Sequence, residues 1–435
     1  MIRFFILAFA LLAAPLRADI EIKEVTSPGG IEAWLVEAPE IPMVSLEILI
    51  EGGASLDRPG KRGAANLMTA LIEEGSGDMD ARAFQAARES LAASFGFRVY
   101  DDSLSITAQF LTENQEEAIA LLRQALTDPR FDQDAIDRVR AQVISGIRAD
   151  ALDPDTIASE TFNALAYGDH PYGTPQDGTI ESVEALTQED MFQSHRDLLV
   201  RDRVYVGAAG DITPEALGEM LDTLLGDLPE GGPDLPEEVA ITLEGGKTVV
   251  DFETPQSVAI FGHEGIERDD PDFFAAFILN EILGGRGLDS RLMDEVREAR
   301  GLTYGVYSFL VPRQHAEVYL GSVASANDRI AEAIEVIKAE WRRMAEEGVT
   351  PEELEEAKTY LTGAYPLRFD GNANIAGILV GMQITDLTPD YVANRNDFIE
   401  AVTLEEINRV AAELLRPDDL HFVVVGQPEG LEVTQ

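Results

Sequence analysis

The segment Val44-Ser45-Leu46-Glu47-Ile48-Leu49-Ile50 alternates apolar and polar side chains over most of its length. A period of two is typical of a β-strand that buries one face. A helical pattern follows from about Ala64 to Glu74 and stops at Gly75. We therefore expect a strand that leads into a helix ended by a glycine turn.

The same order recurs in the second half of the chain. Ser257–Phe261 predicts a strand, and a helical pattern from about Asp272 to Leu283 stops at Gly284-Gly285. The two glycine stops, Gly75 and Gly284, lie 209 positions apart.

A second matching pair lies near the end of each half. Arg203–Gly207 and Phe422–Gly426 both predict a short strand that ends in glycine, 219 positions apart. Thr187 and Thr403, 216 positions apart, both precede a helical pattern with an acid at its third position, as in a capping box. Because these separations agree within about ten residues, we interpret the chain as two duplicated halves. Two unrelated α+β domains with a similar order of elements are the alternative.

The boundary between the halves is visible in the composition. Leu228–Glu238 is rich in proline, glycine and acid and has no apolar period, which favours a linker. The predicted organisation is an N-terminal domain over 19–227, a linker over 228–247 and a C-terminal domain over 248–435. Mixed hairpins and helices favour the α+β class, with a largely antiparallel sheet in each half and helices on one face. Long helices are predicted at Gln188–Leu199, Asp328–Gly348 and Pro351–Ala364.

The N-terminus resembles a targeting segment. Arg3 supplies a positive charge, and Phe4–Ala14 is an uninterrupted apolar run. This run is shorter than the roughly 20 residues that a membrane span needs, and Ala18 offers a small residue for cleavage. We expect residues 1–18 to be a signal peptide and the mature protein to be periplasmic or otherwise exported. A buried N-terminal helix is the alternative.

Composition excludes several classes of protein. The 435 residues include 80 acidic and 33 basic ones, for a net charge of -47 that becomes -49 once Arg3 and Arg17 are removed with the signal peptide. Such a charge repels phosphate backbones and anionic lipid surfaces, so we expect no nucleic-acid partner. The absence of cysteine excludes disulfides, thiolate nucleophiles and Fe–S clusters. We also expect no membrane span in the mature chain.

Histidines are few and scattered. No two of them lie within five residues of each other, and a zinc helix with two histidines and one glutamate needs histidines at i and i+4. Neither order of that motif can therefore form, and ordinary structural roles are expected. The five histidines are His170, His195, His263, His315 and His421.

One local feature suggests chemistry. Leu288–Gly301 predicts a helix with a glycine stop, and Leu302–Phe309 predicts a strand. Arg297 falls in the last turn of the helix and Tyr304 at the start of the strand, so the turn can bring both side chains to one rim. The plainer alternative is that Arg297 pairs with Asp294 on a solvated face and Tyr304 is a core aromatic residue.

The same region carries a family resemblance. The string Leu279–Leu292, with Arg297, Gly301-Leu302 and Tyr304 after it, resembles the C-terminal substrate motif of the pitrilysin and mitochondrial-processing-peptidase family, the inverted-motif zinc peptidases. His170-Pro171-Tyr172-Gly173 resembles a stretch in the N-terminal half of that family. The resemblance covers nearly all of the mature chain. It implies that Arg297 and Tyr304 hold the substrate backbone and support the oxyanion formed when zinc-bound water attacks the peptide.

The zinc half of the family's site is missing. Asn66 and Ala70 stand at the positions of the two histidine ligands, and Thr69 stands at that of the glutamate base. The third ligand of the family is a glutamate on a later helix, yet no glutamate occurs from Ala118 to Ser159. The resemblance therefore implies that this chain binds no metal and that zinc belongs to another subunit.

Some members of the family work as two different subunits, one with zinc and one with the Arg/Tyr pair. This chain resembles the second kind. That implies a zinc-bearing homologous partner, peptide substrates, and a heterodimer in which Arg297 and Tyr304 act in trans. The chain is expected to be inactive alone. The alternative is a catalytically inactive peptide-binding or scaffold protein of the cell envelope. A third alternative, a self-sufficient zinc peptidase, requires stoichiometric metal in the isolated protein.

Overall fold

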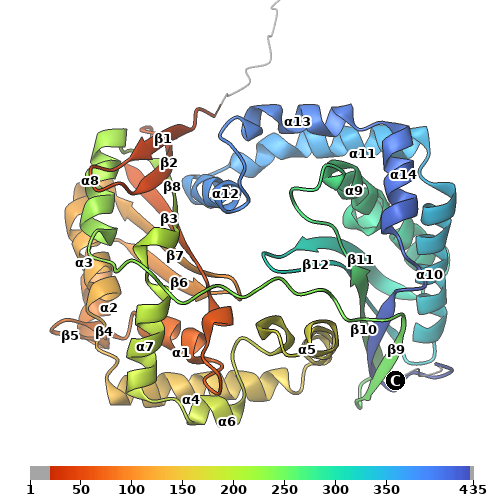
Figure 1. Cartoon of the computed structure of the whole chain (residues 1–435), viewed down its shortest axis with the longest axis horizontal. Coiled ribbons are helices and arrows are strands. Elements are labelled where there is room, and N and C mark those ends of the chain that lie inside the picture. The colour runs from red at the N-terminus through yellow and green to blue at the C-terminus, as the bar shows by residue number, and fades with distance from the viewer. Residues whose placement is uncertain (1–19, 432–435) are drawn as a thin grey trace, which may run out of the picture.

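The computed structural model describes residues 20–431 and shows an α+β fold whose two similar halves face each other across the centre (Figure 1). The predicted fold class is confirmed. The predicted signal peptide, residues 1–18, lies outside the described residues. None of the helices within residues 20–431 combines the length and the apolar character that crossing a bilayer requires.

Each half is built on one large sheet. The strand order is β1-β2-β8-β3-β7-β6 in the first half and β11-β12-β10-β13-β9 in the second. The pairs β2/β8 and β9/β13 are parallel, and the other neighbours in both sheets are antiparallel. The strands are β1 Lys23–Thr26, β2 Glu32–Glu37, β3 Met43–Glu51, β6 Ser94–Val99, β7 Ser103–Leu111, β8 Val204–Gly210, β9 Gly246–Asp251, β10 Gln256–Glu264, β11 Thr303–Pro312, β12 Glu317–Ala326 and β13 His421–Gly426, with a separate short pair β4 Gly75–Ser76 and β5 Met79–Asp80.

The two sheets share one topology. The order β2-β8-β3-β7-β6 corresponds strand by strand to β9-β13-β10-β12-β11, with the parallel pair at the same end, and β1 is one additional strand beyond β2. The central strands β3 and β10 begin at Met43 and Gln256. A shared order that includes the same parallel pair is what duplication of one half predicts.

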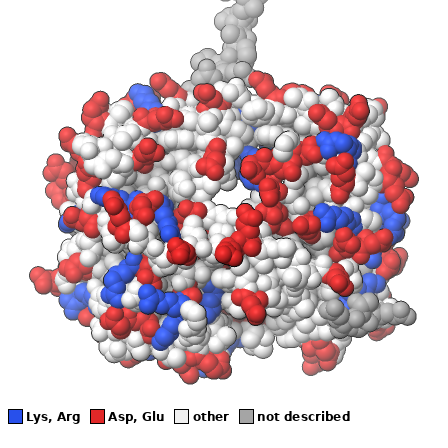
Figure 2. Space-filling model, viewed as in Figure 1, with Lys and Arg blue, Asp and Glu red and all other residues white. Residues whose placement is uncertain are grey.

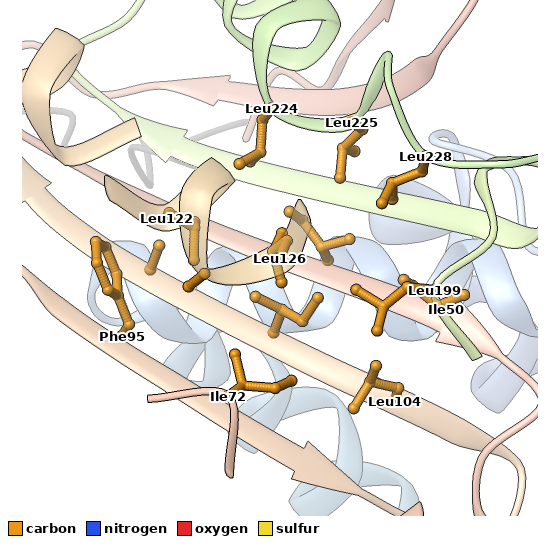
Figure 3. Packing of buried hydrophobic residues seen from close by; sticks show 14 of the residues in the cluster. Ile50, Ile72, Phe95, Leu104, Leu122, Leu126, Leu199, Leu224, Leu225 and Leu228 are labelled. Atoms are coloured by element: carbon orange, nitrogen blue, oxygen red, sulfur yellow. The ribbon is translucent and has the colours of Figure 1, made fainter. Parts of the chain in front are cut away.

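Most helices cover the outer face of their own half's sheet (Figure 1). In the first half the core lies between this layer and the sheet: Leu122 and Leu126 of α3 and Leu224 of α8 belong to the same buried cluster as Ile50 of β3 and Leu104 of β7 (Figure 3). Burying each such side chain stabilises the fold by roughly 1.5–3 kcal/mol. The helices are α1 Ala64–Leu71, α2 Ala81–Ser90, α3 Gln115–Thr127, α4 Gln133–Asp150, α5 Pro154–Tyr167, α6 Ile180–Glu184, α7 Gln188–Leu198, α8 Pro214–Leu225, α9 Phe273–Asn280, α10 Ile330–Glu347, α11 Pro351–Ala364, α12 Asn372–Ile384, α13 Tyr391–Ala401 and α14 Leu404–Leu414.

One helix of each half crosses to the sheet of the other half. α5 packs against β10 and β13, and α12 packs against β8 and β3. Figure 1 shows both helices on the inner side, between the two sheets. We expected helices on one face of each sheet. Most helices of each half do lie there, but α5 and α12 cover part of the opposite, inner face. The exchange joins the two halves into one body.

Local sequence patterns are confirmed with small shifts. Both capping boxes form, because the hydroxyls of Thr187 and Thr403 accept hydrogen bonds from the backbone N–H three residues later. The helix expected from Asp272 to Leu283 is α-helical to Asn280 and continues as a π-helical turn over Glu281–Gly285.

The segment that joins the halves is extended. Residues 226–245, between α8 and β9, contain no helix or strand. The backbone N–H of Val239 donates to His315 O at 2.8 Å, and that of Thr242 donates to Ala166 O at 2.9 Å. The segment is therefore fastened to α5 of the first half and to the β11–β12 connection of the second.

Candidate functional site

The zinc-helix positions of the first half lie on α1. Asn66, Thr69 and Ala70 share one face of this helix, since they are spaced i, i+3 and i+4. Thr69 is buried, its hydroxyl has no hydrogen-bond partner within the described residues, and Ala70 is exposed. An alanine methyl has no lone pair, and a threonine hydroxyl is a poor substitute for a carboxylate base. These residues do not fit a zinc ion.

The start of α1 is nevertheless held firmly. The Asp57 carboxylate accepts hydrogen bonds from the backbone N–H groups of Gly63 at 2.7 Å and Ala65 at 2.8 Å. Burial raises the pKa of Asp57 to about 6, against the opposing effect of these hydrogen bonds and of Arg62. The start of α1 is therefore anchored, although Asn66, Thr69 and Ala70 stand at the positions of the metal ligands and the base.

Outside α1, too, the described part of the chain offers no metal site. No group of three or more His, Asp or Glu side chains within residues 20–431 could hold a metal ion. Three of the histidines have internal hydrogen-bond partners that account for their positions. His195 Nε2 contacts Leu126 O at 2.7 Å, His263 lies between Trp341 Nε1 and Glu264 O, and His421 lies between Thr248 Oγ1 and Glu244 O.

Arg297 stands at the end of a helical turn in the second half. The turn is π-helical over Met293–Glu298. Gly301 ends it with a left-handed φ of 59°, and its N–H donates to Arg297 O at 2.7 Å. The guanidinium lies beside Glu298, with Nε 3.5 Å from the carboxylate, and not beside Asp294 as the solvated-face alternative required. The side chain keeps a third of its surface exposed.

A β-bulge displays Tyr304. Thr303 pairs with Ser325 and Val306 pairs with Val323, so Tyr304 and Gly305 together face one residue of β12. An extra residue in one strand bends it and re-aims a side chain. Tyr304 is 88% exposed. The alternative of a core tyrosine is therefore wrong, and the phenol is free to reach a group outside this chain.

The same edge strand carries two aromatic side chains that sequence reasoning did not assign. Val306 and Ser308 of β11 are buried toward the helix layer, where Ser308 Oγ donates to Asn280 Oδ1 at 2.8 Å. Tyr307 and Phe309 alternate with them and stack on the opposite, inner face with ring centroids 6.5 Å apart, each more than a third exposed. The sequence did offer a signal for this feature, because two aromatic residues at i and i+2 of a predicted strand lie on the same face.

The family stretch His170–Gly173 lies at a junction between the halves. The Tyr172 hydroxyl donates to Asp102 Oδ2 at 2.5 Å, and Arg313 of the second half stands over the Tyr172 ring at 4.6 Å. Arg313 also pairs with Asp101 at 3.2 Å. Burial raises the pKa of Asp102, and burial together with the Asp102 charge raises that of Tyr172, so the shared proton stays on the phenol. The stretch contributes to joining the two halves.

Two family models match the chain. The model described as insulinase, peptidase family M16, matches residues 33–179. The model described as peptidase M16 inactive domain matches residues 185–361. The two matches follow each other along the chain, and the second begins within the first half, just before α7, and ends in α11.

Relatives of full length are also found. A Helicobacter pylori protein called non-peptidase homolog YmxG is 26% identical over 389 residues, which cover 88% of this chain and 89% of that protein. A Bacillus subtilis protein called uncharacterized zinc protease YmxG is 24% identical over 406 residues, 91% of this chain and 96% of that protein. A crystal structure of a peptidase M16 inactive domain from Pseudomonas fluorescens superimposes with a TM-score of 0.88 at 26% identity, over 95% of this chain and 100% of that one.

Proposed function

The chain belongs to the M16 family of insulinase-type peptidases as a member that is inactive on its own, and from this premise we propose that it is the non-zinc subunit of a heterodimeric metallopeptidase. The partner is a homologous subunit that carries zinc. The substrates are peptides held between the two subunits.

The exposure of Tyr304 is the observation that carries this proposal. A bulge turns the phenol away from its own sheet, while the zinc-helix face of α1 offers Asn66, Thr69 and Ala70. This arrangement supports a chain that keeps the substrate-holding corner in the second half and lacks the metal corner in the first. Arg297 and Tyr304 can contribute to catalysis when another subunit supplies the metal.

The chemistry of the pair follows from its hydrogen-bond donors. A phenol O–H and a guanidinium both donate, and both therefore favour an oxygen that gains negative charge during peptide hydrolysis. Removing one such donor from an oxyanion site typically costs roughly 10²–10³ in kcat. Tyr307 and Phe309, exposed on the same strand, offer apolar contacts to the side chains of a bound peptide.

Reconstitution tests the trans role. The homologue that carries the two-histidine, one-glutamate helix is mixed in equal amounts with this chain, and cleavage of a fluorogenic peptide is followed. We expect Arg297→Ala and Tyr304→Phe each to lower kcat by about 10² or more. Tyr360→Phe, which removes the hydroxyl of an exposed tyrosine on α11, is the matched control and should leave kcat unchanged. Wild-type rates with both site variants would refute the trans role.

A second function is favoured by the aromatic pair. Tyr307 and Phe309 can hold an extended peptide without any reaction, as a peptide-binding or scaffold protein of the cell envelope requires. In that case the mixture cleaves peptide no faster than the zinc-bearing homologue alone. Phe309→Ser then weakens the binding of labelled peptides to the isolated chain.

Export is part of the proposal. If residues 1–18 are a signal peptide, the protein recovered from the periplasmic fraction begins at Asp19, which intact-mass measurement determines. Recovery only from the cytoplasm, with Met1–Ala18 still attached, would contradict this proposal.

A further inference from the structure

A cavity of about 720 Å³ lies in the second half, away from Arg297 and Tyr304. Its walls come from α9, α12 and α13 and from the 3₁₀ turn Tyr365–Phe369. Figure 1 shows α12 on the inner side of the molecule, between this part of the second half and the first sheet. The volume lies within the range of sites that bind small organic molecules.

Three arginines meet at this cavity in a chain dominated by acids. Arg268, Arg368 and Arg395 are among its lining residues, and none of the described residues that line it is Asp or Glu. The chain as a whole has 80 acidic residues against 33 basic ones. Buried Glu281 acts electrostatically on Arg395 but is not part of the lining.

Two of these guanidinium groups have neutral hydrogen-bond acceptors. Arg395 is 5% exposed, and its Nη1 donates to the carbonyl oxygen of Leu361 at 2.8 Å and to the Asn396 side chain at 3.2 Å. Arg268 Nη2 donates to the Tyr391 hydroxyl at 3.3 Å. The hydrogen-bond acceptors of Arg395 are neutral, and the charge of Glu281 lies outside the lining, so an anion in the cavity would be a further charge partner for the arginines.

Aromatic rings form much of the remaining wall. The Arg268 guanidinium stands 4.3 Å from the ring centroid of Phe273, and the Arg395 guanidinium stands 4.6 Å from that of Tyr365. Phe274 and Phe277 of α9 also line the space. These rings fix the planes of the guanidinium groups and offer an apolar surface beside them.

Small residues of α12 keep the cavity open. Ala373, Gly377 and Gly381 recur every four residues and line the same face of the helix. A Cβ added at Gly377 or Gly381 would have nothing within 4 Å. A larger side chain at either position would therefore project into the space without displacing the core.

We propose that this cavity binds a small organic carboxylate with an aromatic or branched apolar body. The carboxylate pairs with the arginines, whose planar forks match its two oxygens. The apolar body lies against the phenylalanine rings. A single negative charge fits best, because the strongly acidic remainder of the molecule repels multiply charged anions. The source is either a free acid or the C-terminal residue of a peptide, which share this chemistry.

Calorimetric titration of the full chain tests the site without any partner subunit. N-acetyl-phenylalanine is the probe, N-acetyl-phenylalaninamide removes its charge, and N-acetyl-glycine removes its ring. We expect the acid to bind at least tenfold more tightly than either control. A neutral five-residue peptide that ends in phenylalanine distinguishes the sources: tighter binding than the probe identifies a peptide C-terminus, and weaker binding identifies a free acid.

Variants locate the binding. Gly377→Phe should fill the cavity and abolish binding. Arg268→Met should weaken binding of the acid about tenfold and leave binding of the charge-free amide, N-acetyl-phenylalaninamide, unchanged. Gly146→Phe, at an exposed α4 glycine whose added Cβ also meets nothing within 4 Å, is the matched control and should bind like wild type. Equal binding of the acid and its amide, tighter binding of phenyl phosphate than of the acid, or unchanged binding by Gly377→Phe would overturn the proposal.

Discussion

At the scale of single residues, His263 of β10 shows how the second core excludes charge. The imidazole is buried, its Nε2 accepts from Trp341 Nε1 at 3.0 Å, and its Nδ1–H donates to Glu264 O at 2.6 Å. Because the indole N–H can only donate, Nε2 must be the unprotonated nitrogen. Burial lowers the pKa of His263 from 6.5 to about 4, so the neutral form is the folded form.

The His263 pKa predicts an acid-sensitive contribution to stability. The unfolded chain takes up a proton near pH 6.5 and the folded chain only near pH 4, so this stability is complete above 6.5 and is lost as pH falls toward 4. The loss amounts to about 3 kcal/mol at 1.36 kcal/mol per pKa unit. Urea unfolding measures the free energy of unfolding of wild type and of His263→Gln. The difference between these two free energies should shrink by about this amount between pH 7 and pH 4. A difference that stays constant over that range would refute the assignment.

Tyr304 is predicted to matter for function and not for folding. Its side chain is 88% exposed, and surface substitutions of this kind usually change stability by less than about 0.5 kcal/mol. Tyr304→Phe should therefore unfold at the same urea concentration as wild type. A clear shift of the midpoint would mean that the phenol has an internal partner and that any loss of activity is indirect.

At the scale of elements, the seating of α12 depends on one glycine of β8. A Cβ at Gly207 would overlap the backbone oxygen of Ala376 and come within 3.1 Å of Leu379 Cβ. In the other half, a Cβ at Gly262 of β10 would come within 3.1 Å of the Phe162 ring of α5. Glycine in a strand interior often marks the close approach of another element, and here it does so for both exchanged helices.

Gly207→Ala is therefore expected to destabilise the protein by about 1–3 kcal/mol, as overpacking usually does. Gly377→Ala, on the cavity side of the same helix, should be neutral or stabilising by up to about 1 kcal/mol, because alanine favours the helix and meets open space. Thermal unfolding of the two variants beside wild type measures both effects. If Gly207→Ala unfolds at the wild-type temperature, α12 does not rest on β8 as described.

Elements were predictable from sequence where their signals are local. The alternation of Val44–Ile50 and the capping threonines Thr187 and Thr403 gave strands and helix starts close to those observed. The exchange of α5 and α12 was not predicted, because it depends on contacts between residues that lie far apart in the chain. A partial signal existed: Asn372–Ile384 has no charged residue and is apolar on most sides, which is typical of a helix buried on more than one face.

The candidate site was predictable to a similar degree. Spacing predicted that Arg297 and Tyr304 lie on one helix-to-strand corner, and the family resemblance implied a role for them that stays a prediction. The bulge that exposes Tyr304 is a property of the register between β11 and β12, which the strand pattern alone does not reveal. The cavity depends on Arg268 and Arg395, which only the folded chain brings together.

At the scale of the whole molecule, the duplicated halves have diverged at equivalent corners. α1 beside β6 corresponds to α9 beside β11 in the shared topology. The first corner has lost its metal ligands, and the second displays Tyr304. Figure 2 shows a hollow at the centre of one face, bordered by Asp and Glu side chains. If the proposed function holds, a peptide bound there meets a negative surface, and we predict that basic substrates are preferred.

The central claim is that catalysis is divided between two polypeptides. Its most direct test is the zinc content and peptidase activity of this chain, of the zinc-bearing homologue, and of their equimolar complex, each purified separately. We predict that this chain alone holds no stoichiometric metal and cleaves nothing, and that the complex cleaves peptides far faster than the homologue alone. A tightly bound divalent cation in the isolated chain, accompanied by proteolysis that a chelator abolishes, would contradict the account.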